Sequence, residues 1–195
     1  MKKKERSVNI PTIEEVENEQ KRLRHRAVYQ RTLRGTIAVL LVVAAISVLV
    51  ATLWMPVLQI YGSSMSPTLE AGQIVVSVKT NQLKTGEVVA FWQGNKLLIK
   101  RVIAGPGQWV DIDMDGNVTV DGQTLAEPYL KEKALGNRDI DLPHQVSEAH
   151  WFLMGDNRDT SVDSRSTAIG DISKDQIEGQ IIFRIWPLNK IGSIQ

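Results

Sequence analysis

The chain contains no cysteine among its 195 residues, and this absence narrows the chemistry that it can perform. Without thiols it has neither a cysteine nucleophile nor a thiolate metal site. Disulfide bonds are excluded too, so a domain outside the cytoplasm must be large enough to build its own hydrophobic core. Histidine is scarce, with three residues, and neither His144 nor His150 sits in a recognisable hydrolase constellation. We interpret both as structural residues.

Basic charge is missing from most of the chain. Residues 1–35 hold ten Lys and Arg against five Asp and Glu, whereas residues 36–195 hold thirteen against seventeen. Because no basic patch recurs in this acidic body, we expect no nucleic-acid partner. No internal repeat or low-complexity segment stands out, and the length leaves room for one domain and an anchor.

Charge is entirely absent from residues 36–55, TIAVLLVVAAISVLVATLWM. Twenty helical residues span about 30 Å, the thickness of the hydrocarbon core of a bilayer, and Pro56 ends the helix. Trp54 suits the membrane interface. By the positive-inside rule, the arginines before the run place the N-terminus in the cytoplasm; they are Arg22, Arg24, Arg26, Arg31 and Arg34.

These features predict a single-pass protein of the cell membrane in three parts. They are a basic cytoplasmic segment, 1–35, a transmembrane signal-anchor helix, 36–55, and an extracytoplasmic domain, 56–195. A cleaved signal peptide fits less well, because the apolar run exceeds the usual length of about 7–15 residues. A buried core helix is the other alternative. For residues 1–35, an amphipathic helix beside the membrane and a disordered segment both stay open.

Beyond the anchor, apolar and polar residues alternate with a period of two, which predicts β-strands. Short β-branched or aromatic runs are divided by Gly-containing turns, in QIVVSVKT, GEVVAFWQGNKLLIKRVIAG, GQWVDIDMDGNVTVDGQTL and GQIIFRIWPL. Gly94-Asn95 and Asp115-Gly116 fit hairpin turns, and only residues 173–178 suggest a short helix. The predicted fold class is mainly β, an antiparallel, sheet or barrel-like domain behind one N-terminal transmembrane helix.

A metal site is not indicated. DIDMDG, Asp111 to Gly116, resembles the start of a calcium loop, but the twelfth loop position is Gly122 where a bidentate Glu is needed. An ordinary hairpin with Asp111 and Asp113 on the solvent face explains the stretch better. We expect no metal and no cofactor.

Two stretches hold the parts of a serine nucleophile and its base. GSSMSPTL is either a simple turn with capping hydroxyls or the site of a nucleophile, which needs a neighbouring group to take its proton. In NKLLIKRVIAG, Lys100 shares a strand face with Leu98 and Val102, while Arg101 faces the other side. Lys100 is therefore either a surface lysine with a snorkelling stem or a buried base.

Burial would make Lys100 chemically useful. To be largely neutral near pH 7, its pKa must fall from about 10.4 to about 7, which corresponds to about 4 kcal/mol. A neutral amine can take the proton of a serine hydroxyl. The loop MGDNRDTSVDSRS follows WFLM, an expected buried strand. There Asp163 and Arg165 could form a bidentate ion pair, and Ser161 could hydrogen-bond a buried amine.

Together these stretches resemble the type I signal peptidases of bacteria. GSSMSPTLEAGQIVV is similar to the nucleophile box, IKRVIAGPGQ to the lysine box, MGDNRDTSVDSR to the family's most distinctive signature and GQIIFRIWPL to its closing strand. The resemblance covers nearly the whole chain from the anchor to Pro187. It implies a β-rich domain of the signal peptidase type, resting on the membrane.

The resemblance also implies roles for single residues. Ser64 would be the nucleophile and Lys100 its general base, with Ser161 orienting the amine. Asp163 and Arg165 would brace the site, and Asp156 and Arg158 would support the loop. The backbone N–H of Ser64 would contribute to the oxyanion hole, while Gly62 stands where some relatives have a serine hydroxyl.

Substrates and alternatives follow from the same resemblance. The expected partners are secretory preproteins with small residues before the cleavage site, together with the lipid bilayer. We expect the walls of shallow substrate pockets to be formed by Ile60, Tyr61, Met65, Leu69, Leu98 and Ile99. Two alternatives are a self-processing Ser–Lys peptidase and a non-enzymatic, membrane-anchored β module that binds partners. The second predicts that Lys100 is an ordinary surface amine.

Overall fold

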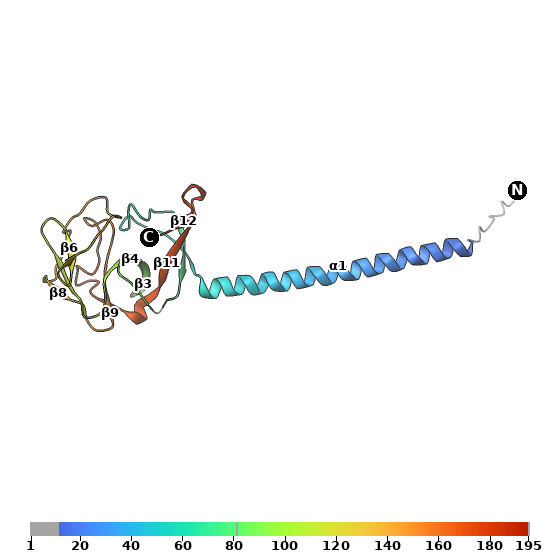
Figure 1. Ribbon diagram of the computed structural model, residues 1–195, viewed down its shortest axis with the longest axis horizontal. Coiled ribbons are helices and arrows are strands. Elements are labelled where there is room, and N and C mark those ends of the chain that lie inside the picture. The colour runs from blue at the N-terminus through green and yellow to red at the C-terminus, as the bar shows by residue number, and fades with distance from the viewer. Residues whose placement is uncertain (1–11, 81, 195) are drawn as a thin grey trace, which may run out of the picture. The chain divides into compact units, whose positions relative to one another are not determined.

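The computed structural model describes residues 12–80 and 82–194. The chain forms two compact units, Met1–Val50 and Ala51–Gln195, and each is described by itself. Figure 1 shows that the first holds a long helix and the second is built from strands.

The helix α1, Ile13–Trp54, is 42 residues long. It starts at a capping box, in which the Glu15 N–H donates to Thr12 Oγ1 and the Thr12 N–H donates to Glu15 Oε2. It ends just before Met55, whose helical conformation the following proline disfavours. Residues 13–35, for which the sequence left helix and disorder open, are therefore helical, whereas residues 1–11 lie outside the described residues.

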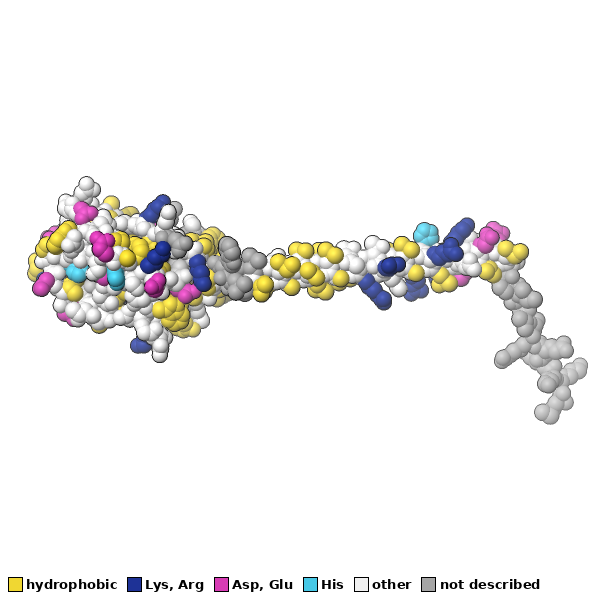
Figure 2. Space-filling model, turned by 90° about the horizontal axis from the view of Figure 1, so that it is seen from below, with side chains coloured by type: hydrophobic (Ala, Val, Ile, Leu, Met, Phe, Trp, Pro, Cys, Tyr) yellow, Lys and Arg dark blue, Asp and Glu magenta, His cyan; other side chains and the backbone are white. Residues whose placement is uncertain are grey.

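Polarity divides this helix along its length. Figure 2 shows basic side chains on its N-terminal half and hydrophobic ones on the rest. Two hydroxyls near or within the apolar run donate to the helix's own carbonyls, Thr36 Oγ1 to Thr32 O at 3.0 Å and Ser47 Oγ to Val43 O at 2.8 Å. Through these bonds the two hydroxyls donate their protons within the helix and need no water as a partner. The helix is long and apolar enough to cross a membrane, while the side chains of residues 50–54, Trp54 included, lie outside the description.

Two antiparallel sheets make up the second unit, which confirms the predicted mainly β fold. The larger sheet has the order β1-β2-β11-β3-β4-β9-β10, with β12 paired to β11. Its strands are β1 Val57–Gln59, β2 Ile74–Val78, β3 Val88–Gln93, β4 Lys96–Ala104, β9 His150–Met154, β10 Ile172–Ser173, β11 Ile177–Trp186 and β12 Gly192–Ser193. The smaller sheet, in the order β7-β6-β5-β8, consists of β5 Trp109–Ile112, β6 Val118–Val120, β7 Gln123–Thr124 and β8 His144–Gln145.

The turns agree with the sequence patterns. Gly94 and Asn95 join β3 to β4, whose last pair is Gln93 and Lys96. The DIDMDG stretch lies in the hairpin of β5 and β6, with Asp111 and Asp113 exposed. The expected short helix is the 3-10 turn η1, Lys174–Gln176, whereas a second, η2, Leu188–Lys190, was not predicted.

The larger sheet carries the lysine and nucleophile segments. β4 lies between β3 and β9, with Lys100 opposite Val89 and Arg101 opposite Met154. The polar loop that leaves β9 therefore starts beside Lys100. The loop between β1 and β2 holds Ser64, and backbone bonds between Ile60 and residues 72 and 73 close its base. Hydrophobic clusters fill the interior around these elements.

Candidate active site

Lys100 is buried in the middle of β4. Only 4% of its surface is exposed, which excludes the alternative of a snorkelling surface lysine. Its Nζ donates a hydrogen bond of 2.9 Å to Ser161 Oγ. The amine is thus held by a loop that lies 61 residues further along the chain.

This environment lowers the pKa of Lys100 from 10.5 to about 8. Burial is the main cause, because an ammonium loses its hydration in the protein interior. Nearby Asp163 opposes the effect by stabilising the charge, whereas Arg165 adds to it. The pKa is higher than the value of about 7 at which the amine would be largely neutral at pH 7, so about a tenth of the amine is neutral at that pH.

Ser64 lies half-buried in the loop between β1 and β2. Its carbonyl oxygen accepts a hydrogen bond of 3.0 Å from the backbone N–H of Asn157, and the carbonyl of Ser63 accepts one of 3.4 Å from Asn157 Nδ2. The polar loop after β9 therefore holds the backbone around Ser64 as well as the amine of Lys100.

Ser64 and Lys100 line the same pocket, which has a volume of about 90 Å³. Five of the six predicted substrate-binding residues lie in its wall, namely Ile60, Tyr61, Met65, Leu98 and Ile99. The sixth, Leu69, does not line it and is fully buried in the core cluster to which Ile60 and Met65 also belong. Gln59 and Leu97 also line the pocket and were not predicted.

Gly62 lies at the same pocket with a φ of +81°. This left-handed conformation strains residues that carry a side chain. The local backbone therefore suits glycine, and the position supplies no side-chain donor.

Gly155 allows the polar loop to approach the two reactive groups. A Cβ atom at this position would overlap Ser161 Oγ and lie 2.5 Å from the carbonyl oxygen of Ser64. The Gly155 N–H donates to Asp163 Oδ2 at 2.9 Å. A residue without a side chain is thus required where the loop meets both segments.

The predicted ion pair of Asp163 and Arg165 is present and bidentate, with N–O distances of 2.8 and 2.9 Å. Both side chains are buried. Burial by itself raises the pKa of Asp163, but the hydrogen bonds and charge of Arg165 outweigh it, so the pKa falls below its usual value. Asp163 is thus an anion at neutral pH near the amine of Lys100.

Two further buried ion pairs hold the loop. Asp156 accepts two hydrogen bonds from Arg101, at 2.9 and 2.7 Å. Arg158 pairs with both carboxylate oxygens of Glu127 and donates to the carbonyl of Gly155 at 3.2 Å. Asp156 and Arg158 therefore each tie the loop to a partner outside it.

Sequence reasoning missed those partners. Arg101 does face away from Lys100, yet it is equally buried, paired with Asp156 and lying 3.8 Å over the ring of Tyr129. Tyr129 in turn donates to Glu127 Oε1 at 3.0 Å. Glu127 and Tyr129 lie in AEPYL, a segment without periodic hydrophobicity, so no local pattern in the sequence indicated that they are buried.

The two histidines lie in structural contacts. His144 Nε2 lies 2.9 Å from Asp171 Oδ1, and His150 Nδ1 lies 2.7 Å from the carbonyl oxygen of Glu148. Neither lines the pocket of Ser64 and Lys100.

Comparison with known proteins identifies the family. Residues 33–186 match the family described as "Signal peptidase, peptidase S26". The chain belongs to the signal peptidase family. It is accordingly a serine hydrolase, and the activity of the family is cleavage of signal peptides.

Individual relatives agree with this family. Signal peptidase IB of Staphylococcus aureus strain COL is 36% identical over 151 residues, covering 67% of this chain and 78% of that protein. Signal peptidase I of Bacillus licheniformis is 32% identical over 167 residues, covering 79% of this chain and 88% of that protein. The crystal structure of a signal peptidase I from Enterococcus faecalis V583 aligns with a TM-score of 0.45 and 24% identity, over 52% of this chain and 98% of that one.

Proposed function

We propose that Ser64 and Lys100 form the catalytic dyad with which this protein removes signal peptides from secretory preproteins. The observation that carries the proposal is the shared pocket, where a buried amine with a pKa of about 8 lies in the same wall as a serine. The competing idea of a non-enzymatic binding module required an ordinary surface amine at Lys100. A side chain that is 4% exposed contradicts it.

The first half of the reaction is acylation. Neutral Lys100 takes the proton of Ser64 Oγ as that oxygen attacks the carbonyl carbon of the scissile peptide bond. The negative charge that develops on the carbonyl oxygen is stabilised by the backbone N–H of Ser64 and by a second donor. When the C–N bond breaks, the Lys100 ammonium gives its proton to the leaving amine. The signal peptide stays on Ser64 as an ester.

Deacylation uses the same base. Lys100, neutral again, takes a proton from water, and the hydroxide attacks the ester carbonyl. The C–O bond to Ser64 breaks, and the serine oxygen regains its proton from Lys100. In both steps Ser161 orients the amine, while Asp163 and Arg165 fix the position of Ser161's loop.

We further propose that α1 anchors the protein in the cell membrane once, with the N-terminus in the cytoplasm and residues 56–195 outside. The uncharged run and the preceding arginines support this orientation. Cleavage sites with small side chains fit a pocket of about 90 Å³ walled by apolar residues. The bilayer and secretory preproteins are then the partners.

The proposal is tested with the full chain in lipid vesicles and a secretory precursor. Ser64→Ala and Lys100→Ala are each expected to abolish cleavage. Lys96→Ala, an exposed lysine on the same strand, and Ser147→Ala, an exposed serine, are expected to cut like the parent. If either dyad variant cuts as fast as the parent, the assignment is wrong. Incubation of the protein without precursor tests self-processing, which we do not expect.

A further inference from the structure

A second and larger hollow is lined in part by the nucleophile loop. Its volume is about 520 Å³. Three segments form its wall: the nucleophile loop, the polar loop after β9, and the segment that follows Tyr129. Its lining residues are Ser66, Pro67, Glu70, Lys131, Glu132, Lys133, Ala134, Asp156, Asn157, Arg158 and Asp159. We call it the charged cavity.

The charged cavity and the pocket of Ser64 and Lys100 share one turn. Ser64 and Met65 line the pocket, and Ser66 and Pro67, the next two residues, line the cavity. Asn157, in the cavity wall, donates to the carbonyl of Ser64. A peptide whose scissile carbonyl lies at Ser64 can therefore extend into one hollow before the cleaved bond and into the other after it.

The chemistry of the substrate indicates which hollow binds the residues before the scissile bond and which binds the residues after it. The residues before a signal-peptide cleavage site are small and apolar, and the pocket of about 90 Å³ has the size and apolar wall to select them. A cavity of about 520 Å³ rimmed by charges is too large and too polar to make that selection. We infer that the charged cavity binds the first residues of the mature protein, the polar segment that leaves after cleavage. This assignment rests on the proposed function of Ser64.

Several charges of the cavity are already neutralised. Asp156 and Arg158 belong to buried ion pairs, and Glu70 pairs with Lys190. These contacts fix the walls. They leave other charged groups to recognise the substrate.

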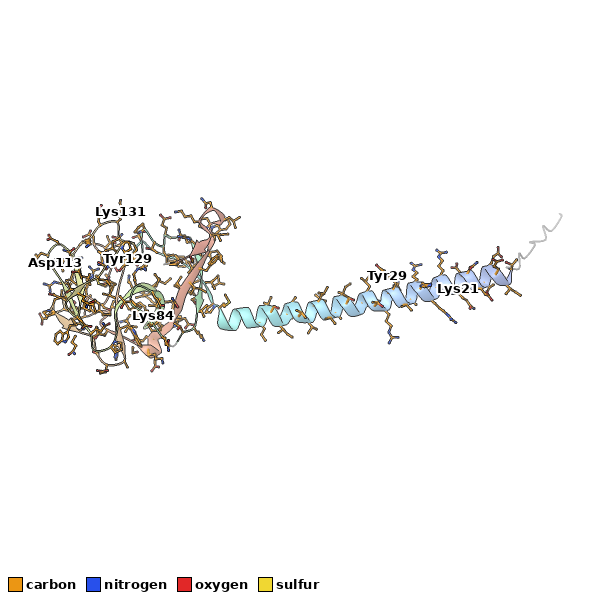
Figure 3. The ribbon with its side chains drawn as sticks, in the orientation of Figure 1. Lys21, Tyr29, Lys84, Asp113, Tyr129 and Lys131 are labelled. Atoms are coloured by element: carbon orange, nitrogen blue, oxygen red, sulfur yellow. The ribbon has the colours of Figure 1, made fainter. Side chains whose placement is uncertain are left out.

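Four exposed side chains of the cavity have no ion pair within the described part of the chain, namely Lys131, Glu132, Lys133 and Asp159. Figure 3 places Lys131 at the margin of the β unit and Tyr129, two residues earlier, further inside. Asp159 follows Asn157 by two residues and is therefore, along the chain, the unpaired charge closest to the residue whose N–H bonds the Ser64 carbonyl. With two acids against two bases the rim carries no net charge, and it is the position of Asp159 that favours a basic side chain soon after the cleaved bond.

The test compares precursors that carry Lys or Glu at the second, third or fourth position after the scissile bond. The measured quantity is the ratio of kcat/KM for the Lys precursor to that for the Glu precursor. For the parent we expect a ratio of about three at one of these positions, since an exposed ion pair changes affinity only a few-fold. Asp159→Lys should reverse the preference, and Lys131→Glu should strengthen it.

The matched control is Asp175→Lys, because Asp175 is an exposed aspartate that lines neither hollow. Its ratio should equal that of the parent. The inference is overturned if Asp159→Lys and Lys131→Glu leave the ratio unchanged, or if they change it only for charges placed before the scissile bond. Failure of the dyad itself would show differently, as cleavage by Ser64→Ala.

Discussion

Replacing Lys100 by methionine should abolish cleavage and at the same time stabilise the folded protein. The lysine is 4% exposed, and its pKa falls from 10.5 to about 8 on folding. At 1.36 kcal/mol for each pH unit, the burial of this ammonium costs the folded state about 3 kcal/mol at neutral pH. Methionine has a similar length and carries no charge. It forfeits the hydrogen bond to Ser161, worth about 1 kcal/mol, so the net gain is about 2 kcal/mol.

The pH dependence of this gain identifies its cause. Because the pKa is lower in the folded protein than in the unfolded chain, the unfolded chain binds more protons between about pH 8 and pH 10.5. The stability of the parent therefore rises with pH over this window, whereas that of Lys100→Met lacks this rise. The free energy of unfolding of Lys100→Met should exceed that of the parent by the full amount, about 2 kcal/mol, at pH 7, and by close to zero at about pH 9.5.

Urea denaturation of the full chain in detergent, followed by tryptophan fluorescence from pH 6 to pH 9.5, measures the difference. Lys96→Met is the control, because Lys96 is exposed on the same strand and should show no such pH dependence. The reasoning is refuted if Lys100→Met is no more stable than the parent at pH 7, or if its advantage does not change with pH.

Three other outcomes follow from the site. Cleavage by the parent, measured as kcat/KM, should rise about tenfold from pH 7 to pH 9, because the neutral form of Lys100 with a pKa of about 8 is the active base. Gly155→Ala should reduce kcat at least about a hundredfold, because the added Cβ overlaps Ser161 Oγ and displaces the orienting hydroxyl. Glu127→Gln should lower the free energy of unfolding by about 3 kcal/mol in urea titrations, because it leaves the buried Arg158 charge without its anion.

Each of these predictions has a contrary result, and each of the two variants has a matched control. A kcat/KM that is flat between pH 7 and pH 9 would exclude a base with this pKa. Gly192→Ala, at a glycine with open space around it, should cut normally, and equal activity of Gly155→Ala would contradict the close approach. Glu148→Gln alters an exposed carboxylate and should leave stability unchanged. A Glu127 variant that behaves in the same way would mean that the ion pair contributes little.

Local patterns were sufficient for much of the fold. The alternation of residues along 88–104 predicted the hairpin around Gly94, because the two strands and their turn are neighbours in the chain. The uncharged run predicted a helix. Its full extent from Ile13 was not predicted, because the polar residues before the run suit a solvated helix and a disordered segment equally.

By itself, the sequence determined which reactive side chains the site could use, namely a serine and a lysine but no thiol. It also determined the order of the motifs along the chain. Only the tertiary structure decided that Lys100 is buried, since the alternation of residues on the strand is the same for a buried lysine and for a snorkelling surface lysine. It also decided which groups compensate the buried charges. Glu127 and Arg158 are 31 residues apart, and Arg101 and Asp156 are 55 apart. Burial and ion pairing depend on what folding brings together across such distances, and no local spacing encodes them.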